Sequence, residues 1–207
     1  MKLNPQTTAC VSIDMHRGHL DPSVATLPLP AERCAPLIAR TAELFRSLRA
    51  LEVPIVHVVS EFRDAQEAAA NPFWKSIHDD PTKVRKGLLR HNLEGSPGTE
   101  IIPELFEEGD LVVRGKKRYS AFFATDLEFL LRRRLKVDTV ILTGVNTSSC
   151  ILCSGFDATN RDFRVIIAEE GVDSMDGEEA HRFALRILAA TSGWVMNNEA
   201  ILKALQA

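Results

Sequence analysis

The fold is decided by the stretch DTVILTGVNTSSC, residues 138–150. Its first half is an almost continuous apolar run, which is typical of a parallel strand covered on both faces. Residues 148–160 then predict a helix, so Cys150 falls in the first turn of a helix directly after a strand. Open α/β sheets bind their ligands at this edge, beyond the carboxyl ends of the strands.

Two interpretations of Cys150 follow from this position. The free backbone N–H groups and the dipole of a helix N-terminus favour a thiolate, which lowers the pKa of the thiol and indicates a nucleophile. A buried structural cysteine is the commoner fate of this residue type. The position alone leaves both interpretations open.

On both sides of this stretch, apolar runs alternate with segments whose apolar residues recur at helical spacing. The predicted strands are residues 8–14, 53–60, 111–113, 137–144, 163–168 and 194–196, and the predicted helices are residues 31–51, 126–135, 148–160, 177–190 and 199–205. Such alternation implies right-handed βαβ units and helices on both faces of a sheet. We therefore predict an α/β fold of the three-layer α/β/α, Rossmann-like type, with an open, six-stranded, mostly parallel sheet.

The chain of 207 residues is predicted to form a single domain, residues 1–207, with one long insertion. The insertion spans residues 61–109, where several prolines and glycines interrupt any periodic pattern. This is long for a plain connection, so we expect it to contain short helices and to cover a site. The same pattern also suits a subunit interface.

Composition and charge exclude several classes of function. The formal net charge of −3 gives no electrostatic case for binding nucleic acid or an anionic membrane. No apolar run has the length of a membrane span, and the first residues lack the apolar core of a signal peptide, so we expect a cytoplasmic protein. The other three cysteines, Cys10, Cys34 and Cys153, are assigned to packing, because their spacing indicates neither a disulfide scaffold nor a thioredoxin-type redox site.

Two more polar residues are predicted to share the sheet edge with Cys150. Asp14 ends the first predicted strand and Lys116 follows the third. Taken singly, Asp14 reads as a turn-capping residue and Lys116 as an exposed lysine in a basic run. Together with the thiol they form a coherent set, because Lys116 would keep Asp14 ionised. Asp14 would then accept the thiol proton and return it to a leaving amine.

Three blocks of sequence carry a resemblance that covers nearly the whole chain. They are VSIDM at residues 11–15, KKRYSAF at 116–122 and TGVNTSSC at 143–150, and DSM at 173–175 is a further match. With these blocks the chain resembles the isochorismatase-like cysteine hydrolases. That family includes nicotinamidases, N-carbamoylsarcosine amidohydrolases, ureidoacrylate and biuret amidohydrolases, and isochorismatases.

The resemblance implies that Asp14, Lys116 and Cys150 are the catalytic triad. The family lysine stands three residues before the tyrosine of the Tyr-Ser-Ala-Phe block, which selects Lys116 over Lys117. The implied activity is hydrolysis of a C–N bond in a small amide, ureido or carbamoyl compound through a thioester. Two alternatives stay open: a vinyl-ether hydrolase of the isochorismatase type, and a non-catalytic binding protein on the same fold.

The resemblance also implies an unusual backbone geometry before the cysteine. The family has a non-proline cis peptide there, which in this chain would join Val145 and Asn146. Such a bond is rare and costs several kcal/mol. It would turn the Asn146 N–H toward the site, to form an oxyanion hole with the Cys150 N–H.

Departures from the family pattern concern the substrate. The aspartate block usually continues with glutamine, whereas this chain has His16 and His19, which would contact substrate or shape the loop. Phe73 and Trp74 of the insertion would form an aromatic wall of the pocket or pack in the core. Tyr119 is a further candidate for substrate binding.

The sequence predicts no metal, no cofactor and no macromolecular ligand. Nicotinamidases bind a metal with an Asp-x-His pair and another histidine after the second strand, whereas this chain has SEFRD at residues 60–64. The HDD at residues 78–80 has ligand-like residue types but predicts a turn before Pro81. We expect a small-molecule substrate and, because family members are commonly oligomeric, a homodimer or homotetramer.

Overall fold

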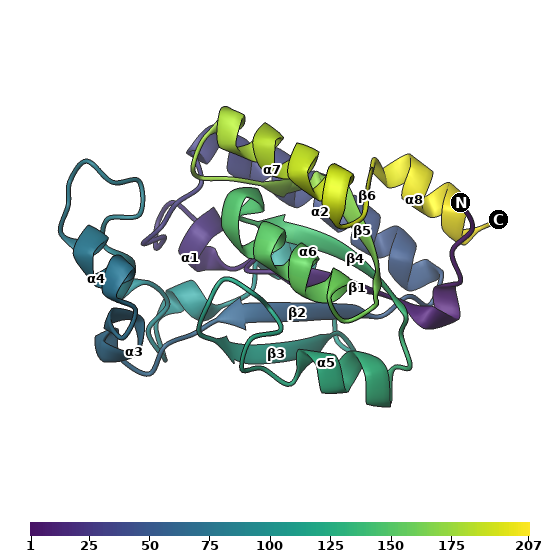
Figure 1. Ribbon diagram of the computed structural model, residues 1–207, viewed down its shortest axis with the longest axis horizontal. Helices are drawn as coiled ribbons and strands as arrows, with labels where there is room; N and C mark the ends of the chain where they lie inside the picture. Colours follow the sequence, from purple (N-terminus) through teal and green to yellow (C-terminus); the bar gives the residue numbers. More distant parts are fainter.

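In the computed structural model, which describes residues 1–207, six strands form one sheet. They are β1 (Thr8–Ile13), β2 (Ile55–Ser60), β3 (Leu111–Lys116), β4 (Thr139–Val145), β5 (Arg164–Asp173) and β6 (Trp194–Met196). Their order in space is β3-β2-β1-β4-β5-β6, and every neighbouring pair is parallel (Figure 1). The predicted α/β fold with a six-stranded sheet is confirmed, and the sheet is parallel throughout.

The side chains of the central strands enter two apolar layers in alternation, as the period of two along a strand requires. On β1, Val11 and Ile13 pack into one layer and Cys10 into the other. The first layer is covered by α5 (Leu127–Phe129), α6 (Leu152–Thr159) and α7 (Glu178–Thr191), and the second by α2 (Ala31–Ala50) and α8 (Asn198–Leu205). None of the helices combines the length and the apolar character needed to span a membrane.

Some element boundaries differ from the sequence prediction, mainly where polar residues continue an element. β3 runs on to Lys116 instead of ending at Val113, because it is an edge strand with exposed side chains and needs no apolar run. β5 continues past Ala168 to Asp173, although Glu169 is exposed. The predicted helices 126–135 and 148–160 each contain a π-helical turn, Leu130–Arg134 and Thr147–Ile151 respectively.

The insertion of residues 61–109 is built from short helices and turns. It contains α3 (Ala65–Ala69), α4 (Pro72–His78) and the 3₁₀ turns Leu88–Arg90, Pro97–Thr99 and Pro103–Leu105. Asp64 and Asn71 cap α3 and α4, since each side chain accepts two backbone N–H groups of the first turn. A third apolar cluster anchors the insertion and also includes Leu27 and Met175 from outside it.

Candidate active site

Asp14, Lys116 and Cys150 meet at the carboxyl ends of the central strands. Asp14 follows β1, Lys116 is the last residue of β3, and Cys150 lies in the π-helical turn after β4. Lys116 Nζ donates a hydrogen bond to Asp14 Oδ2 at 2.6 Å and lies 3.4 Å from Cys150 Sγ. All three side chains are buried. The structure thus brings the predicted set together, with the ammonium between the acid and the thiol.

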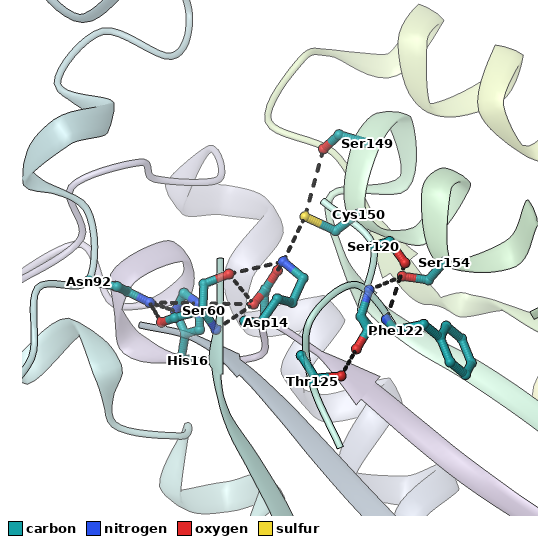
Figure 2. Close-up of polar contacts among 12 residues, drawn as sticks. Asp14, His16, Ser60, Asn92, Ser120, Phe122, Thr125, Ser149, Cys150 and Ser154 are labelled. Carbon is teal, nitrogen blue, oxygen red and sulfur yellow. Dashed lines mark hydrogen bonds and ion pairs between the residues drawn. The ribbon is translucent and has the colours of Figure 1, made fainter. Parts of the chain in front are cut away.

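Ser60, the last residue of β2, completes the contacts of Asp14. Its backbone N–H and its hydroxyl both donate to Asp14 Oδ1, at 2.9 and 2.7 Å (Figure 2). Lys116 Nζ donates to Ser60 Oγ at 3.0 Å. Because β2 lies between β1 and β3, it supplies the residue that ties the side chains of its two neighbours together. Sequence reasoning missed Ser60, although its place at the end of a predicted strand was a usable signal.

The end of β4 approaches β1 very closely beside this site. Gly144 pairs with Ile13, and a Cβ at Gly144 would lie only 1.9 Å from the carbonyl oxygen of Ile13. Gly144 also has a φ of 121°, so both the space and the backbone require glycine. Asp14 itself has a φ of 57°, in the left-handed region that few non-glycine residues adopt. This junction sets Asp14 beside the turn that carries Cys150.

The Tyr-Ser-Ala-Phe block is tied to the helix of the cysteine. Ser154 lies one turn after Cys150, and its hydroxyl accepts the backbone N–H of Ala121 at 2.9 Å. The carbonyl oxygen of Ala121 in turn accepts the hydroxyl of Thr125 at 2.6 Å, and the N–H of Phe122 donates to Ser120 Oγ at 3.1 Å (Figure 2). These bonds fix the segment after β3 against α6, which holds Lys116 and Cys150 in register.

The electrostatics of the site favour an ionised acid and an ionised lysine. Burial opposes the charge on Asp14, but the Lys116 ammonium and the contact with His16 outweigh it and hold the pKa of the carboxyl well below its ordinary value of 3.8. Burial likewise opposes the charge on Lys116, but Asp14 and Cys150 raise its pKa above 10.5. At neutral pH the pair is therefore a carboxylate and an ammonium.

The pKa of the Cys150 thiol is shifted upward, against the sequence expectation of a lowered pKa. Burial raises the pKa of Cys150 above 9.0 and the charge of Asp14 adds to this, against the opposing charges of Lys116 and Arg85. The residue is only 5% exposed, and its helix begins with a single π-helical turn rather than a regular N-terminus. The thiol is thus protonated at rest, and an acceptor for its proton is needed.

The peptide bond between Val145 and Asn146 is cis, at the position that the family resemblance indicated. Asn146 Oδ1 accepts the backbone N–H of Met175 at 2.8 Å, which fixes the orientation of the side-chain amide. Asn146 Nδ2 is buried without a partner, and the residue lines the same pocket as Cys150. This amide is therefore a hydrogen-bond donor that is available to a substrate.

A pocket opens onto Cys150, and only some of the predicted substrate-binding residues line it. His19, Trp74 and Tyr119 line the pocket, and Trp74 Nε1 donates to the Tyr119 hydroxyl at 3.0 Å. His16 is fully buried behind the lining, near Asp14. Phe73 is 65% exposed and outside the pocket, because consecutive residues of a helix such as α4 point in different directions.

Two arginines give the pocket a positive character. Arg85 Nη2 donates to Asp176 Oδ2 at 2.6 Å and to Ser149 Oγ at 3.0 Å. The Arg118 guanidinium lies 5.1 Å from the ring centroid of Trp74 and donates to the backbone oxygen of Lys117, but it forms no ion pair. Both line the pocket, in which Asp14 is the one carboxylate.

Sequence reasoning missed several of these lining residues. Arg85 and His91 come from the insertion, where no periodic pattern marks a position as inward-facing. Arg118 stands inside the KKRYSAF block, so its proximity to Lys116 was the available signal. Lys117, in contrast, turns away from the site and pairs with Glu67 at 2.8 Å, which agrees with the choice of Lys116.

An open parallel sheet with a buried thiol, carboxylate and ammonium at its carboxyl edge defines an α/β enzyme with a candidate cysteine nucleophile. The model of the isochorismatase domain matches residues 8–200. The chain therefore belongs to the isochorismatase family, and the family prediction is confirmed.

Named relatives support the same class of enzyme. The chain is 31% identical over 178 residues to maleamate amidohydrolase from Pseudomonas putida, a match that covers 84% of this chain and 77% of that protein. It is 27% identical over 210 residues to ureidoacrylate amidohydrolase RutB from Methylobacterium radiotolerans, covering 98% of this chain and 81% of that protein. The chain is a hydrolase whose relatives are amidohydrolases, which act on C–N bonds other than peptide bonds, and the predicted class is confirmed.

Solved structures show the same fold. A cysteine hydrolase from Pseudomonas syringae pv. phaseolicola superposes with a TM-score of 0.85 at 22% identity, covering 100% of this chain and 95% of that one. N-carbamoylsarcosine amidase from Thermoplasma acidophilum superposes with a TM-score of 0.71 at 24% identity, covering 96% and 98%. At these identities the agreement concerns the fold.

Proposed function

We propose that this protein hydrolyses a C–N bond of a small amide, ureido or carbamoyl compound, with Cys150 as the nucleophile. The observation that carries the proposal is the position of Lys116 Nζ, 2.6 Å from Asp14 Oδ2 and 3.4 Å from Cys150 Sγ. A buried carboxylate, ammonium and thiol in contact is a costly arrangement for stability alone, and all three side chains line one pocket.

In the first half of the reaction, Asp14 accepts the proton of the Cys150 thiol while sulfur attacks the substrate carbonyl carbon. The negative charge on the carbonyl oxygen is stabilised by the backbone N–H groups of Asn146 and Cys150. Asp14 then gives its proton to the substrate nitrogen, the C–N bond breaks, and ammonia or an amine leaves. The acyl group stays on Cys150 as a thioester.

In the second half, water replaces the amine. Asp14 accepts a proton from the water as its oxygen attacks the thioester carbon. The C–S bond breaks, the acid leaves, and the proton on Asp14 returns to the Cys150 sulfur. Lys116 stays charged throughout, holding Asp14 in place and stabilising negative charge on sulfur.

The charge of the pocket supports a substrate that is itself an acid. Arg118 lines the pocket and has no carboxylate partner, whereas Arg85 is paired with Asp176. Maleamate and ureidoacrylate, the compounds in the names of two relatives, each combine an amide or ureido group with a carboxylate. A small ureido or amide acid is thus the substrate type that we propose first.

The test is an ammonia-release screen over small amides, ureido acids and carbamoyl compounds. On a substrate that passes the screen, Cys150→Ser and Asp14→Asn should reduce turnover to near background, and Cys153→Ser should retain it. Acid quench of the wild-type reaction should trap an acyl group on Cys150, seen by mass spectrometry. Full turnover by Cys150→Ser would refute the mechanism.

The vinyl-ether alternative has a separate signature. Isochorismatases can dispense with the cysteine, whereas this chain keeps Cys150 beside Asp14 and Lys116. A Cys150→Ala protein that still cleaved a vinyl ether would favour the alternative over C–N hydrolysis. The predicted homodimer or homotetramer stays a prediction, which light scattering on the eluted protein would test.

A further inference from the structure

Three buried histidines form a cluster in the wall of the pocket. His16 immediately precedes α1 (Arg17–Leu20) and His19 lies in it, whereas His91 belongs to the insertion. The ring centroids are 4.9 Å apart for His16 and His19, 4.5 Å for His19 and His91, and 5.5 Å for His16 and His91. One ring nitrogen of each lies within 4.8 Å of the others, and none of the three residues is more than 5% exposed. The fold therefore gathers three imidazoles from distant parts of the chain.

Two of the rings are held through Nδ1. His19 Nδ1 lies 2.6 Å from the carbonyl oxygen of Leu27, which only accepts, so Nδ1 carries the proton and Nε2 keeps its lone pair. His91 Nδ1 lies 2.8 Å from the hydroxyl of Thr26, and its Nε2 is buried with no partner. Histidines that bind metals are commonly oriented in this way, by a hydrogen bond from the ring nitrogen that does not bind the metal.

His16 connects the cluster to Asp14. Its Nε2 lies 3.6 Å from Asp14 Oδ1. The side-chain nitrogen of Asn92 donates to the backbone oxygen of Ser60 at 2.8 Å and also contacts the His16 ring (Figure 2). A cation held by the three rings would face the negative charge of Asp14.

A buried nitrogen of the cluster has no hydrogen-bond partner. The Nε2 of His91 is buried and unpartnered, and an unsatisfied buried polar atom is costly. A metal ion bound by the lone pair of this nitrogen would supply the missing partner.

We propose that His16, His19 and His91 bind one divalent transition-metal cation of the Zn²⁺ or Co²⁺ type. Three protein ligands and one open position are typical of catalytic zinc sites. His19 and His91 line the pocket of Cys150, so the open position would face the substrate. Metal–nitrogen bonds of about 2.0–2.1 Å place the ligating nitrogens of a tetrahedral site roughly 3.4 Å apart. The ring nitrogens lie within 4.8 Å of one another, so metal binding would bring any two of them closer by at most about 1.4 Å.

The proposed ligands differ from the Asp-x-His arrangement of nicotinamidases. That arrangement lies after the second strand, where this chain has SEFRD at residues 60–64. The three histidines come instead from the segment after β1 and from the insertion. The proposal is independent of the proposed hydrolysis, because its test measures metal and not turnover.

The test starts from chelator-treated, full-length protein under reducing conditions. Titration with CoCl₂ should give one bound ion per chain by calorimetry, together with the visible d–d bands of Co²⁺ bound by nitrogen at low coordination number. His19→Gln and His91→Gln should weaken binding by more than about 100-fold, beyond the loss expected for a residue that only orients a ligand. His78→Gln is the matched control, since His78 is outside the cluster and should leave binding unchanged.

Cys150→Ala separates the histidine site from binding to the thiol. Retained Co²⁺ binding in Cys150→Ala supports the proposal, whereas loss there with retention in His19→Gln and His91→Gln overturns it. No stoichiometric Co²⁺ or Zn²⁺ binding by the wild type also overturns it. If a histidine variant fails to fold, ¹H–¹⁵N spectra of the wild-type histidines are recorded with and without Zn²⁺. A bound Zn²⁺ must shift the Nε2 signals of His19 and His91, and unchanged signals would refute the site.

Discussion

Replacement of Lys116 by methionine tests the central claim about the site, that this ammonium holds a buried charge in place. Lys116 is 1% exposed and Asp14 is fully buried, and their atoms are 2.6 Å apart. Removing one partner of such a pair leaves an uncompensated charge, which typically costs about 3–5 kcal/mol. Lys116→Met should therefore lower the free energy of unfolding at pH 7 by about that amount, measured by urea denaturation.

The neighbouring lysine provides a matched control. Lys117 pairs with Glu67 at the surface, where its side chain is 26% exposed. Exposed pairs contribute less than about 1 kcal/mol, so Lys117→Met should be nearly neutral. Equal destabilisation by Lys116→Met and Lys117→Met would refute the reasoning.

The pH dependence of the same variant has a defined sign. In the wild type the lowered pKa of Asp14 gives a contribution to stability that is present above the ordinary aspartate pKa and is lost as the pH falls through the lowered value. Without Lys116, burial dominates and raises the pKa of Asp14. The stability difference between wild type and Lys116→Met should therefore begin to shrink as the pH falls through the raised pKa of Asp14 in the variant, because the variant regains stability there. It should shrink further below the ordinary value of 3.8, where the wild type loses its contribution. A difference that stayed constant from pH 7 to pH 3 would contradict this account.

Three further predictions use separate observations. Arg118→Met should raise the KM of carboxylate-bearing substrates by about 10- to 100-fold, which is the value of a charged hydrogen bond, and should leave the KM of neutral amides unchanged. Arg114→Met, at an exposed arginine, is the control. Gly144→Ala should lower the free energy of unfolding by more than about 1 kcal/mol in urea, and by more than Gly95→Ala, which has a positive φ but no atom near its Cβ. The acid limb of the pH profile of kcat/KM should lie below pH 3.8, because activity is lost only as the pH falls through the lowered pKa of Asp14.

The parts of the fold that the sequence predicted are those where a single physical rule dominates. The central strands are covered on both faces, so β1 and β4 read as apolar runs. The ends of parallel strands share one edge, so Asp14 and Cys150 could be placed together before any contact was known. The edge strand β3 has no such covering, and its extension to Lys116 had no apolar signal.

The remaining parts depend on long-range contacts that no local pattern encodes. His91 meets His19 and His16 only because the insertion folds back over the sheet edge, and Arg85 reaches Ser149 in the same way. The exposure of Phe73 and the burial of Trp74 follow from how one short helix is turned against its neighbours. The sign of the shift in the Cys150 pKa depends on burial, which position in a helix did not reveal.

The direction of that pKa shift bears on the order of steps in the proposed hydrolysis. The ordinary pKa values of a thiol and an aspartate, 9.0 and 3.8, already differ by 5.2, and in this site the thiol is shifted up and the carboxyl down. From the ordinary values alone, moving the proton from Cys150 to Asp14 before any bond forms would cost about 7 kcal/mol, at 1.36 kcal/mol for each pKa unit. Formation of the C–S bond removes this cost, because charge that would rest on sulfur passes to the carbonyl oxygen and its N–H donors. In the proposed mechanism, proton transfer and attack are thus best coupled.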